Sequence, residues 1–289
     1  MSVSSRNLFT NPIGDSVTFD SILDALGEPF FADDRFVLYN RDCVEGMRAM
    51  PRGVVDLTVT SPPYNIGKAY ETNKPLDDYV DWSRDWINAV HDVTADDGAF
   101  WLNVGYMPIH DAGKAVPLPY LLWNLSDFFL IQEVVWNYGA GVAGRLFFSP
   151  RNEKFLWYVK NSAEYHFDLD AVRDPDVKYP NQFKNGRRKV NPLGKNPTDV
   201  WQFKKVTSGK NRSSKERAAH PAQFPEAVIE RVVKATSAEG DIVLDPFMGS
   251  GTTAVVASRL GRRVLGFETS AEYCEGAVQR YKNSSELLL

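Results

Sequence analysis

The stretch DIVLDPFMGSGTTAVVASRLGRRVLGFE, residues 241–268, carries the clearest fold signal in the chain. It begins with an apolar run at 241–245 that is typical of a strand, and a turn with two glycines follows. Residues 252–260 then predict a helix, and residues 263–267 predict a second strand. A strand, a helix and a second strand in this order predict two parallel strands of an α/β sheet.

The turn between the first strand and the helix suits a nucleoside-bearing cofactor. Gly249 and Gly251 let the backbone approach a ligand where a side chain would clash. Glu268, at the end of the second strand, can accept hydrogen bonds from ribose hydroxyls. Asp245 would repel a pyrophosphate but tolerate a cationic methionine moiety, which favours S-adenosylmethionine over NAD. Residues 249–254 also fit the dinucleotide pattern G-x-G-x-x-A, and a purely structural turn is a third interpretation. A phosphate-binding P-loop is excluded, because no Lys-Ser/Thr follows the glycines.

Strands and helices also alternate along the rest of the chain. Further strands are predicted where short runs are apolar or β-branched, at 36–39, 54–60, 99–104, 130–136 and 155–159. Further helices are predicted where apolar residues recur at helical spacing, at 17–26, 44–50, 79–93, 118–128, 225–236 and 271–281. The alternation predicts an α/β fold with a mostly parallel, doubly wound sheet and helices on both of its faces.

The strand predicted at 54–60 runs into a second motif, Ser61-Pro62-Pro63-Tyr64. Consecutive prolines fix the backbone and lack N–H groups, so the carbonyls and the Ser61 hydroxyl can face a ligand as acceptors. With the flat ring of Tyr64 beside them, these acceptors suit the exocyclic amino group of a base held by stacking. The alternative is a proline-rich turn with a packing tyrosine. The end of a buried strand in an α/β sheet, however, is where ligands bind.

The charge of the chain is distributed unevenly. The formal net charge is -4, but residues 184–217, the basic island, contain eleven basic and two acidic residues. This island therefore carries +9, and the rest of the chain carries -13. It is rich in glycine, proline and serine, and the aromatic residues Phe183, Trp201 and Phe203 lie beside or within it. The island is interpreted either as a solvated surface insert or as an element that contacts nucleic-acid phosphates and bases.

The composition excludes several classes of protein. The 289 residues are 43% apolar and 24% charged, as in an ordinary globular chain. Two cysteines, Cys43 and Cys274, are too few for a disulfide framework or a four-thiolate zinc site, and they suit a reducing compartment. No stretch approaches the roughly 18 apolar residues of a membrane span, and the N-terminus has no apolar h-region of a secretory signal.

Taken together, the two motifs resemble those of the DNA amino-methyltransferases, which use S-adenosylmethionine to methylate N4 of cytosine or N6 of adenine. The catalytic motif of that family is (Asp/Ser/Asn)-Pro-Pro-(Tyr/Phe), and its cofactor motif contains Phe-x-Gly-x-Gly, here residues 247–251. The catalytic motif precedes the cofactor motif, with the basic island between them, and this order is similar to the β class. The resemblance covers about residues 36–281, including the stretches 151–160 and 220–225.

This resemblance implies a Rossmann-like methyltransferase fold, circularly permuted, with a small target-recognition insert. The implied organisation is an N-terminal arm and helix (1–35), a catalytic half (36–160), a basic target-recognition insert (161–219) and a cofactor-binding half (220–289). The implied partners are double-stranded DNA, a second copy of the chain and a cognate restriction endonuclease, with no membrane. A cytoplasmic location in a bacterium or archaeon is expected.

The resemblance and the motifs together also assign site residues. The catalytic residues are Ser61, Pro62, Pro63 and Tyr64. The residues that bind S-adenosylmethionine, or its product S-adenosylhomocysteine, are Asp42, Cys43, His220, Asp245, Phe247, Gly249, Gly251, Thr252 and Glu268. Asp42 lies where the family holds the adenine amino group. The DNA-binding residues are Arg187, Arg188, Lys189, Lys204, Lys205, Lys210 and Arg212, and no metal is expected.

The implied mechanism is direct methyl transfer to a base that has flipped out of the duplex. The Ser61 hydroxyl and the Pro62 carbonyl would orient the amino nitrogen for in-line attack, and Tyr64 would stack on the base. C5-cytosine enzymes need a Pro-Cys nucleophile, which neither Cys43 nor Cys274 provides. Serine at the first motif position favours N4 of cytosine over N6 of adenine within the family. A nicotinamide-dependent oxidoreductase and a non-enzymatic nucleic-acid binder are the remaining alternatives.

Overall fold

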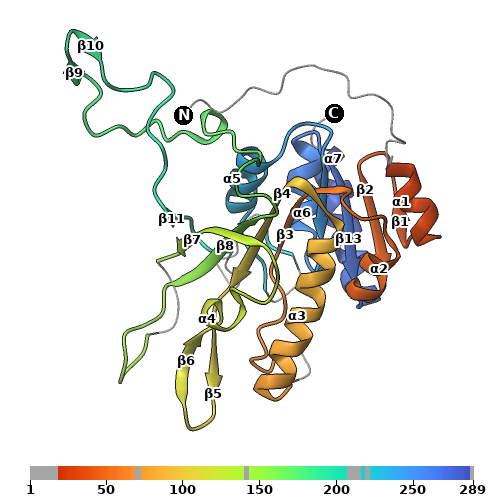
Figure 1. Cartoon of the computed structure of the whole chain (residues 1–289). Coiled ribbons are helices and arrows are strands. Elements are labelled where there is room, and N and C mark those ends of the chain that lie inside the picture. The colour runs from red at the N-terminus through yellow and green to blue at the C-terminus, as the bar shows by residue number, and fades with distance from the viewer. Residues whose placement is uncertain (1–18, 69–72, 140–142, 207–215, 219–221, 287–289) are drawn as a thin grey trace.

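A nine-stranded sheet runs through the computed structural model, which describes residues 19–68, 73–139, 143–206, 216–218 and 222–286 (Figure 1). The strands in spatial order are β1 (Phe31–Ala32), β2 (Phe36–Asn40), β13 (Arg263–Glu268), β12 (Ile242–Asp245), β3 (Val55–Thr60), β4 (Thr94–Val104), β8 (Asn152–Val159), β7 (Phe129–Asn137) and β11 (Val200–Gln202). In this spatial order, the neighbouring strands β2, β13, β12, β3 and β4 are all parallel to one another. Strand β8 is antiparallel to both β4 and β7. The two last strands in the sequence, β12 and β13, lie between β2 and β3, so the halves of the chain interleave in the permuted order.

Helices cover both faces of the sheet (Figure 1). One face packs against α1 (Phe19–Leu26), α2 (Cys43–Ala49), α3 (Leu76–Val93) and α4 (Pro119–Leu122). The other packs against α5 (Glu226–Thr236), α6 (Thr252–Arg259) and α7 (Ala271–Glu286). Strand β2 contributes side chains to the hydrophobic cores on both faces of the sheet. Val37 and Tyr39 point to the first face, and Phe36 and Leu38 point to the second. The mostly parallel, doubly wound sheet that the sequence predicts is therefore confirmed.

One predicted helix is much shorter in the structure. The helix predicted at 118–128 is the short α4, which ends at Leu122, because the polar residues at 124, 126 and 127 favour turns over a helix interior. The part of the first predicted helix before Phe19 lies outside the described residues.

The structure also contains two hairpins that the sequence did not predict. One joins β5 (Tyr106–Ile109) to β6 (Gly113–Pro117). The other joins β9 (Phe183–Lys184) to β10 (Arg187–Arg188) within the basic island. Asn185 and Gly186 form the turn of the second hairpin with positive φ angles of 52° and 75°. An Asn-Gly pair is a strong hairpin signal, so this element could have been recognised from the sequence.

The basic island begins away from the sheet and returns to it. The β9–β10 hairpin projects from the body of the molecule at the upper left of Figure 1. Strand β11 then pairs in parallel with β7 at the end of the main sheet. Trp201 of β11 is buried in the second core and stacks near Trp101, so it does not face a nucleic-acid base as its place in the island had suggested.

Candidate functional site

A cavity of about 520 Å³ opens at the carboxyl ends of β2, β3, β12 and β13. Cavities of this size, at this edge of an α/β sheet, are typical of ligand sites. Both sequence motifs contribute to its wall. The residues assigned from the sequence that line it are Asp42, Cys43, Ser61, Pro62, Pro63, Tyr64, Lys205, Phe247, Gly249 and Glu268.

The glycine turn after β12 is held in shape by Glu268. One carboxylate oxygen of Glu268 accepts the N–H of Gly249 at 3.0 Å, and the other accepts the N–H of Ser270 at 2.9 Å. Gly249 and Gly251 have φ angles of 48° and 72°, which favour glycine. A Cβ on Gly251 would also lie 2.9 Å from the Cβ of Ala277, so α7 leaves no room for a side chain there. The turn thus presents backbone to the cavity.

Asp245 lies behind the cavity wall instead of lining it. Its buried carboxylate accepts hydrogen bonds from the hydroxyls of Thr60 and Thr253, both at 2.6 Å, and from the N–H of Phe247 at 3.1 Å. Burial raises the pKa of this carboxyl to about 6, although the three hydrogen bonds oppose that rise. Asp245 therefore ties the end of β3 and the first turn of α6 to the glycine turn.

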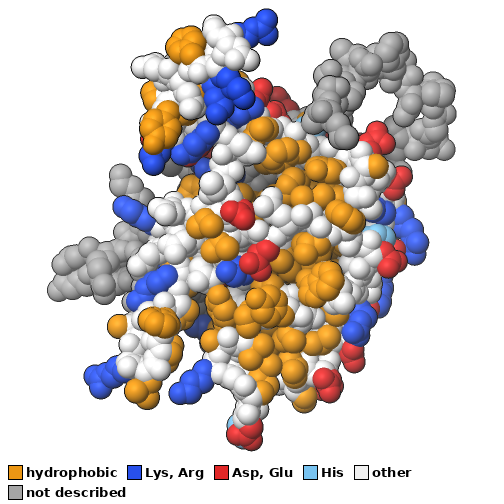
Figure 2. All heavy atoms as spheres, turned by 60° about the vertical axis from the view of Figure 1, so that its left-hand side comes forward, with side chains coloured by type: hydrophobic (Ala, Val, Ile, Leu, Met, Phe, Trp, Pro, Cys, Tyr) orange, Lys and Arg blue, Asp and Glu red, His pale blue; other side chains and the backbone are white. Residues whose placement is uncertain are grey.

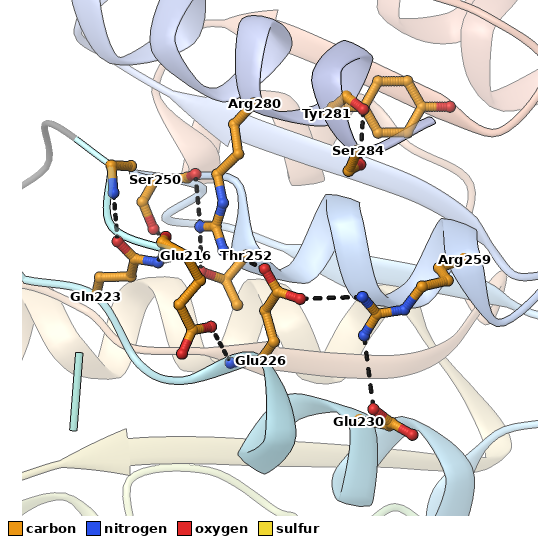
Figure 3. A network of polar contacts seen from close by, with 11 residues as sticks. Glu216, Gln223, Glu226, Glu230, Ser250, Thr252, Arg259, Arg280, Tyr281 and Ser284 are labelled. Carbon is orange, nitrogen blue, oxygen red and sulfur yellow. Dashed lines mark hydrogen bonds and ion pairs between the residues drawn. The ribbon is translucent and has the colours of Figure 1, made fainter. Parts of the chain in front are cut away.

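Thr252 is likewise buried beneath the glycine turn and does not line the cavity. The Arg280 guanidinium donates to the Thr252 hydroxyl at 2.7 Å and to the Ser250 carbonyl at 3.2 Å (Figure 3). Its second amino group donates to Glu226 at 2.8 Å. No motif in the sequence signals Arg280, because it lies 28 residues from Thr252 on a different helix.

The same polar network continues from Glu226 to the cavity (Figure 3). The N–H of Glu226 donates to the carboxylate of Glu216 at 2.9 Å. The amide of Gln223, which lines the cavity, donates to the carbonyl of Glu216 at 2.7 Å. The network therefore joins the glycine turn to Glu216 at the end of the basic island and to Gln223 in the segment that follows it.

Ser61 and the two prolines directly follow β3 and form one side of the cavity. The carbonyl of Pro63 accepts a hydrogen bond from the Tyr79 hydroxyl at 2.9 Å, which ties the motif to α3. Within the described residues, no donor reaches the Pro62 carbonyl. The Ser61 side chain lies beside Tyr64, with the two hydroxyl oxygens 3.1 Å apart.

The Tyr64 hydroxyl lies among several oxygen atoms. The Tyr64 oxygen is 3.0 Å from the Glu153 carboxylate and 3.0 Å from the Asn103 side-chain oxygen, and the hydroxyl can donate its proton to either one. The Tyr64 ring packs close to Gly105, where a Cβ would be 3.1 Å from a ring carbon. Burial, followed by the nearby Glu153 charge, holds the pKa of Tyr64 well above its ordinary range. Burial also raises the pKa of Glu153. No sequence motif signals Asn103 or Glu153, because both come from strands far from Tyr64 in the chain.

Asp42 and Cys43 begin α2 at the opposite side of the cavity. The Asp42 carboxylate caps the helix by accepting the N–H groups of Val44 at 2.9 Å and Glu45 at 3.1 Å. One of its oxygens makes both bonds, so the other is available to a ligand. Cys43 is buried, and burial raises its pKa, so it is not a reactive thiolate.

The predicted DNA-binding residues that the structure describes lie in two places, beside the cavity and at the β9–β10 hairpin. Lys205 lines the cavity, with its ammonium 5.1 Å from the centre of the Tyr138 ring, and the neighbouring Lys204 is exposed. Arg187 and Lys189 are exposed at the β9–β10 hairpin, and Arg188 belongs to β10. Lys210, Arg212 and the predicted cofactor residue His220 lie outside the described residues.

Basic and hydrophobic side chains gather together on the face drawn in Figure 2. Its upper lobe, formed by the hairpin region, carries Lys and Arg beside hydrophobic groups. Phe183 and Tyr179 belong to this region and are 65% and 62% exposed. Exposed basic side chains can contact the phosphates of a nucleic acid, and exposed aromatic rings beside them can stack on its bases.

The chemistry of the cavity fits a nucleoside-bearing cofactor. Glu268 offers carboxylate oxygens to hydroxyl donors, Asp42 offers one to an amino group, and Phe247 offers an aromatic ring. Across the described part of the chain, no group of three His, Cys, Asp or Glu side chains could hold a metal ion. In the same part, none of the helices is long and apolar enough to cross a membrane.

Comparisons with known proteins agree on one family. The model of an N6/N4 family described as DNA methylase matches residues 55–279. The type II methyltransferase M.ScaI of Streptomyces caespitosus is 59% identical over 267 residues, which cover 92% of this chain and 88% of that protein.

Two solved structures share the fold. The PvuII DNA methyltransferase, described as cytosine-N4-specific, has a TM-score of 0.70 at 20% identity and covers 89% of this chain and 93% of its own. A DNA modification methylase of Thermus thermophilus, solved with S-adenosyl-L-methionine, has a TM-score of 0.60 at 23% identity over 86% of this chain and 95% of its own.

Proposed function

The chain belongs to the N6/N4 DNA methylase family, and we propose that it transfers a methyl group from S-adenosylmethionine to the exocyclic N4 of cytosine in duplex DNA. The observation that carries this proposal is the meeting of two motifs in one cavity. Ser61 and the prolines form one wall, and the glycine turn with Glu268 forms another. A methyl donor and a target amino group held by these walls would lie next to each other.

The cofactor would be held by the residues around the glycine turn. Glu268 would accept hydrogen bonds from the ribose hydroxyls, Phe247 would contact the adenine ring, and Asp42 would accept from its amino group. S-adenosylmethionine supplies an electrophilic methyl group on a positively charged sulfur, and S-adenosylhomocysteine is the product. The Asp245 carboxylate would act indirectly, by fixing the turn from below.

The target base would be held by the motif after β3. Its amino nitrogen is conjugated with the ring and is a weak nucleophile, so orientation supplies much of the rate. The amino group would donate to the Ser61 hydroxyl and to the Pro62 carbonyl, for which no described residue competes. Tyr64 would support the base in the cavity after it leaves the duplex.

The basic island would hold the DNA. Phosphates are attracted by exposed Lys and Arg, and Arg187, Lys189 and Lys204 are all exposed. Lys205 connects this surface to the cavity. The island between the two halves of the methyltransferase domain therefore has the charge that a target-recognition element needs, while the acidic remainder limits indiscriminate DNA binding.

Cytosine is favoured over adenine by the serine at position 61, which accompanies N4-cytosine enzymes in the family that the sequence resembles. The similarity in fold to a cytosine-N4-specific enzyme points in the same direction. The alternative is N6 of adenine, because the matching family model covers both reactions. From the family resemblance we also expect a cognate restriction endonuclease and a dimer, and the relative M.ScaI is named a type II methyltransferase.

The deciding experiment is nucleoside mass spectrometry of unmodified DNA after incubation with the enzyme and S-adenosylmethionine. N4-methylcytosine is the expected product. N6-methyladenine would change the assigned base and leave the rest of the proposal in place. If neither base is methylated while a known amino-methyltransferase works on the same DNA, the proposed function is wrong.

A further inference from the structure

We propose that Glu153 takes up the proton that the target amino group loses, through the hydroxyls of Ser61 and Tyr64. This inference rests on the proposed function. It gives a role in the reaction to a carboxyl group that belongs to neither sequence motif. Glu153 also lines the cavity, but its hydrogen-bonded connection to Ser61 runs through Tyr64, so we assign it a proton-accepting role through that connection rather than by contact with the base.

The three side chains form a continuous hydrogen-bonded path along the cavity wall, which all three residues line. The Ser61 and Tyr64 hydroxyl oxygens are 3.1 Å apart, and the Tyr64 hydroxyl is 3.0 Å from the Glu153 carboxylate. These distances are within hydrogen-bond range at each step. Ser61 lines the cavity at the place where the amino group would be held.

The network contains more acceptors than protons. Tyr64 has one hydroxyl proton, yet its oxygen lies near Glu153, the Asn103 side-chain oxygen at 3.0 Å and the Asn103 carbonyl at 3.3 Å. The Asn103 amide nitrogen donates to the Lys154 carbonyl at 3.1 Å, and the Asn103 side chain also makes a hydrogen bond to Glu153 that lowers the pKa of that carboxyl. With Glu153 ionised, Tyr64 can satisfy one of these acceptors at a time. One additional proton on Glu153 would therefore improve the hydrogen bonding of the whole group.

The reaction produces such a proton. The amino nitrogen uses its lone pair to form the new C–N bond, while the C–S bond breaks and its electron pair stays on sulfur. The nitrogen then carries a positive charge and loses one proton to the Ser61 oxygen, and the electron pair of the broken N–H bond stays on nitrogen as its new lone pair. Ser61 passes its own proton to Tyr64, and Tyr64 passes its own proton to Glu153. Each hydroxyl is restored, and only the Glu153 carboxylate gains a proton.

The electrostatic surroundings of Glu153 suit an acceptor. Burial raises its pKa, so it binds a proton more readily than an exposed glutamate, while the hydrogen bond from Tyr64, the charge of Lys205 and the hydrogen bond from Asn103 oppose this shift. The other titratable and charged groups around it are Tyr106, Tyr138, Arg151 and the Lys154–Glu133 pair. A Glu153 carboxyl that is already protonated cannot accept the proton from Tyr64. The rate of methyl transfer should therefore fall as the pH falls through the raised pKa of Glu153.

The alternative is that Glu153 merely holds the Tyr64 ring in place. Two variants separate these roles. Glu153→Gln keeps the size and a hydrogen-bonding oxygen but cannot take up a proton. Tyr64→Phe keeps the ring against Gly105 but removes the hydroxyl that links Ser61 to Glu153. Glu133→Gln is the matched control, since Glu133 is 38% exposed and lies on the neighbouring strand β7.

The experiment measures single-turnover methylation of a duplex between pH 5 and 9, together with calorimetric binding of S-adenosylmethionine. Both variants should slow methylation by at least ~100-fold, the lower end of the usual contribution of general acid–base catalysis. The double variant should be no slower than either one, because both interrupt one path. Glu153→Gln should also lose the acidic limb of the wild-type profile, and cofactor binding should stay unchanged.

Several results would overturn the proposal. Full activity of either variant would exclude the path, and so would an acidic limb that persists in Glu153→Gln. Additive losses in the double variant, or weakened cofactor binding, would indicate a structural role instead. If the wild-type enzyme methylates no DNA, the proposed function itself fails, whereas an active wild type with unaffected variants overturns only the role of Glu153.

Discussion

Arg280 on α7 and Glu226 at the start of α5 form an ion pair in which the nitrogen and oxygen are 2.8 Å apart. The Arg280 side chain is only 12% exposed, and its other nitrogen holds Ser250 and Thr252 of the glycine turn. One guanidinium thus fixes two helices and the turn relative to one another. The shape of the proposed cofactor site depends on a residue that is not part of its wall.

Arg280→Ala should weaken both the protein and the proposed cofactor site. The substitution removes the Arg280 donor from the Ser250 carbonyl and from Thr252 and leaves Glu226 paired with Arg259 alone. Removing one partner of a largely buried pair costs up to about 3 kcal/mol. Urea unfolding should show this loss, and the dissociation constant for S-adenosylmethionine should rise.

Arg259→Ala is the matched control for this prediction. Arg259 also pairs with Glu226, at 3.0 Å, but its side chain is 34% exposed and does not reach the glycine turn. A more exposed pair contributes at most about 1 kcal/mol. Equal effects of the two substitutions on cofactor affinity would contradict a specific role for Arg280.

Gly251→Ala should destabilise the fold through two separate effects. A left-handed backbone costs an alanine about 1–2 kcal/mol, and the φ of Gly251 is 72°. The new Cβ would also lie 2.9 Å from the Cβ of Ala277. Adding Ala277→Gly should recover little stability, because the Cα of residue 277 would still lie 3.0 Å from the new Cβ and glycine costs the helix about 1 kcal/mol; thermal unfolding of both variants can measure this.

Gly276→Ala tests whether the loss of stability expected for Gly251→Ala comes from the position of that glycine rather than from any exchange of glycine for alanine. Gly276 lies next to Ala277 on α7, and a Cβ there would meet nothing within 4 Å. Because alanine favours a helix over glycine by about 1 kcal/mol, this change should be neutral or stabilising. A loss of stability as large as that of Gly251→Ala would show that the close approach of α7 to the turn is not the cause.

The sequence predicts the parts of the site that are local in the chain. Gly249, Gly251 and Glu268 lie within one strand-helix-strand unit, so their spacing alone brings them to one turn. Arg280 and Glu153 could not be predicted in this way. Their partners are 28 and 89 residues away, and only the packing of α7 and β8 brings them together.

The burial of Asp245 gives this motif residue a role that the sequence alone does not predict. From the sequence, Asp245 is a carboxylate at the end of a strand, where it could face a ligand. In the structure, Thr60 and Thr253 occupy both of its oxygens inside the protein. A hydroxyl partner far away in the sequence leaves no local signal, which is why the direction of a side chain is harder to predict than the strand that carries it.

Asp245→Asn should alter how stability depends on pH. The pKa of Asp245 is raised to about 6 in the folded protein, so the folded state binds this proton more tightly than the unfolded state. The tighter proton binding stabilises the folded protein fully at a pH below the pKa that Asp245 has in the unfolded chain. This stabilisation of about 3 kcal/mol is lost as the pH rises through the pKa that Asp245 has in the folded protein. The asparagine variant has no such titration.

The measurement is the free energy of unfolding of both proteins from pH 4 to pH 8. Other carboxyl groups contribute equally to each, so the difference between the curves isolates Asp245. The wild type should lose stability relative to Asp245→Asn between pH 4 and pH 7. A constant difference would mean that the hydrogen bonds from Thr60 and Thr253 outweigh burial and keep the pKa near its ordinary value.

Neutralising the β9–β10 hairpin should reduce the salt dependence of DNA binding. Lys184, Arg187 and Lys189 are exposed, and each contact with a phosphate adds about 0.9 to the slope of log affinity against log salt. The triple glutamine variant should therefore bind with a slope smaller by about 2–3, as fluorescence anisotropy at several salt concentrations can measure.

A second triple variant, of Arg48, Arg52 and Arg84, removes the same charge from a different surface. These three arginines are 64%, 82% and 48% exposed and pair with aspartates on α3, and none lines the cavity. A general loss of positive charge would affect both variants alike, because long-range attraction depends on the charge of the whole protein. A smaller slope in the hairpin variant alone would locate the phosphate contacts in the basic island, and equal slopes would exclude the hairpin as a DNA-binding element.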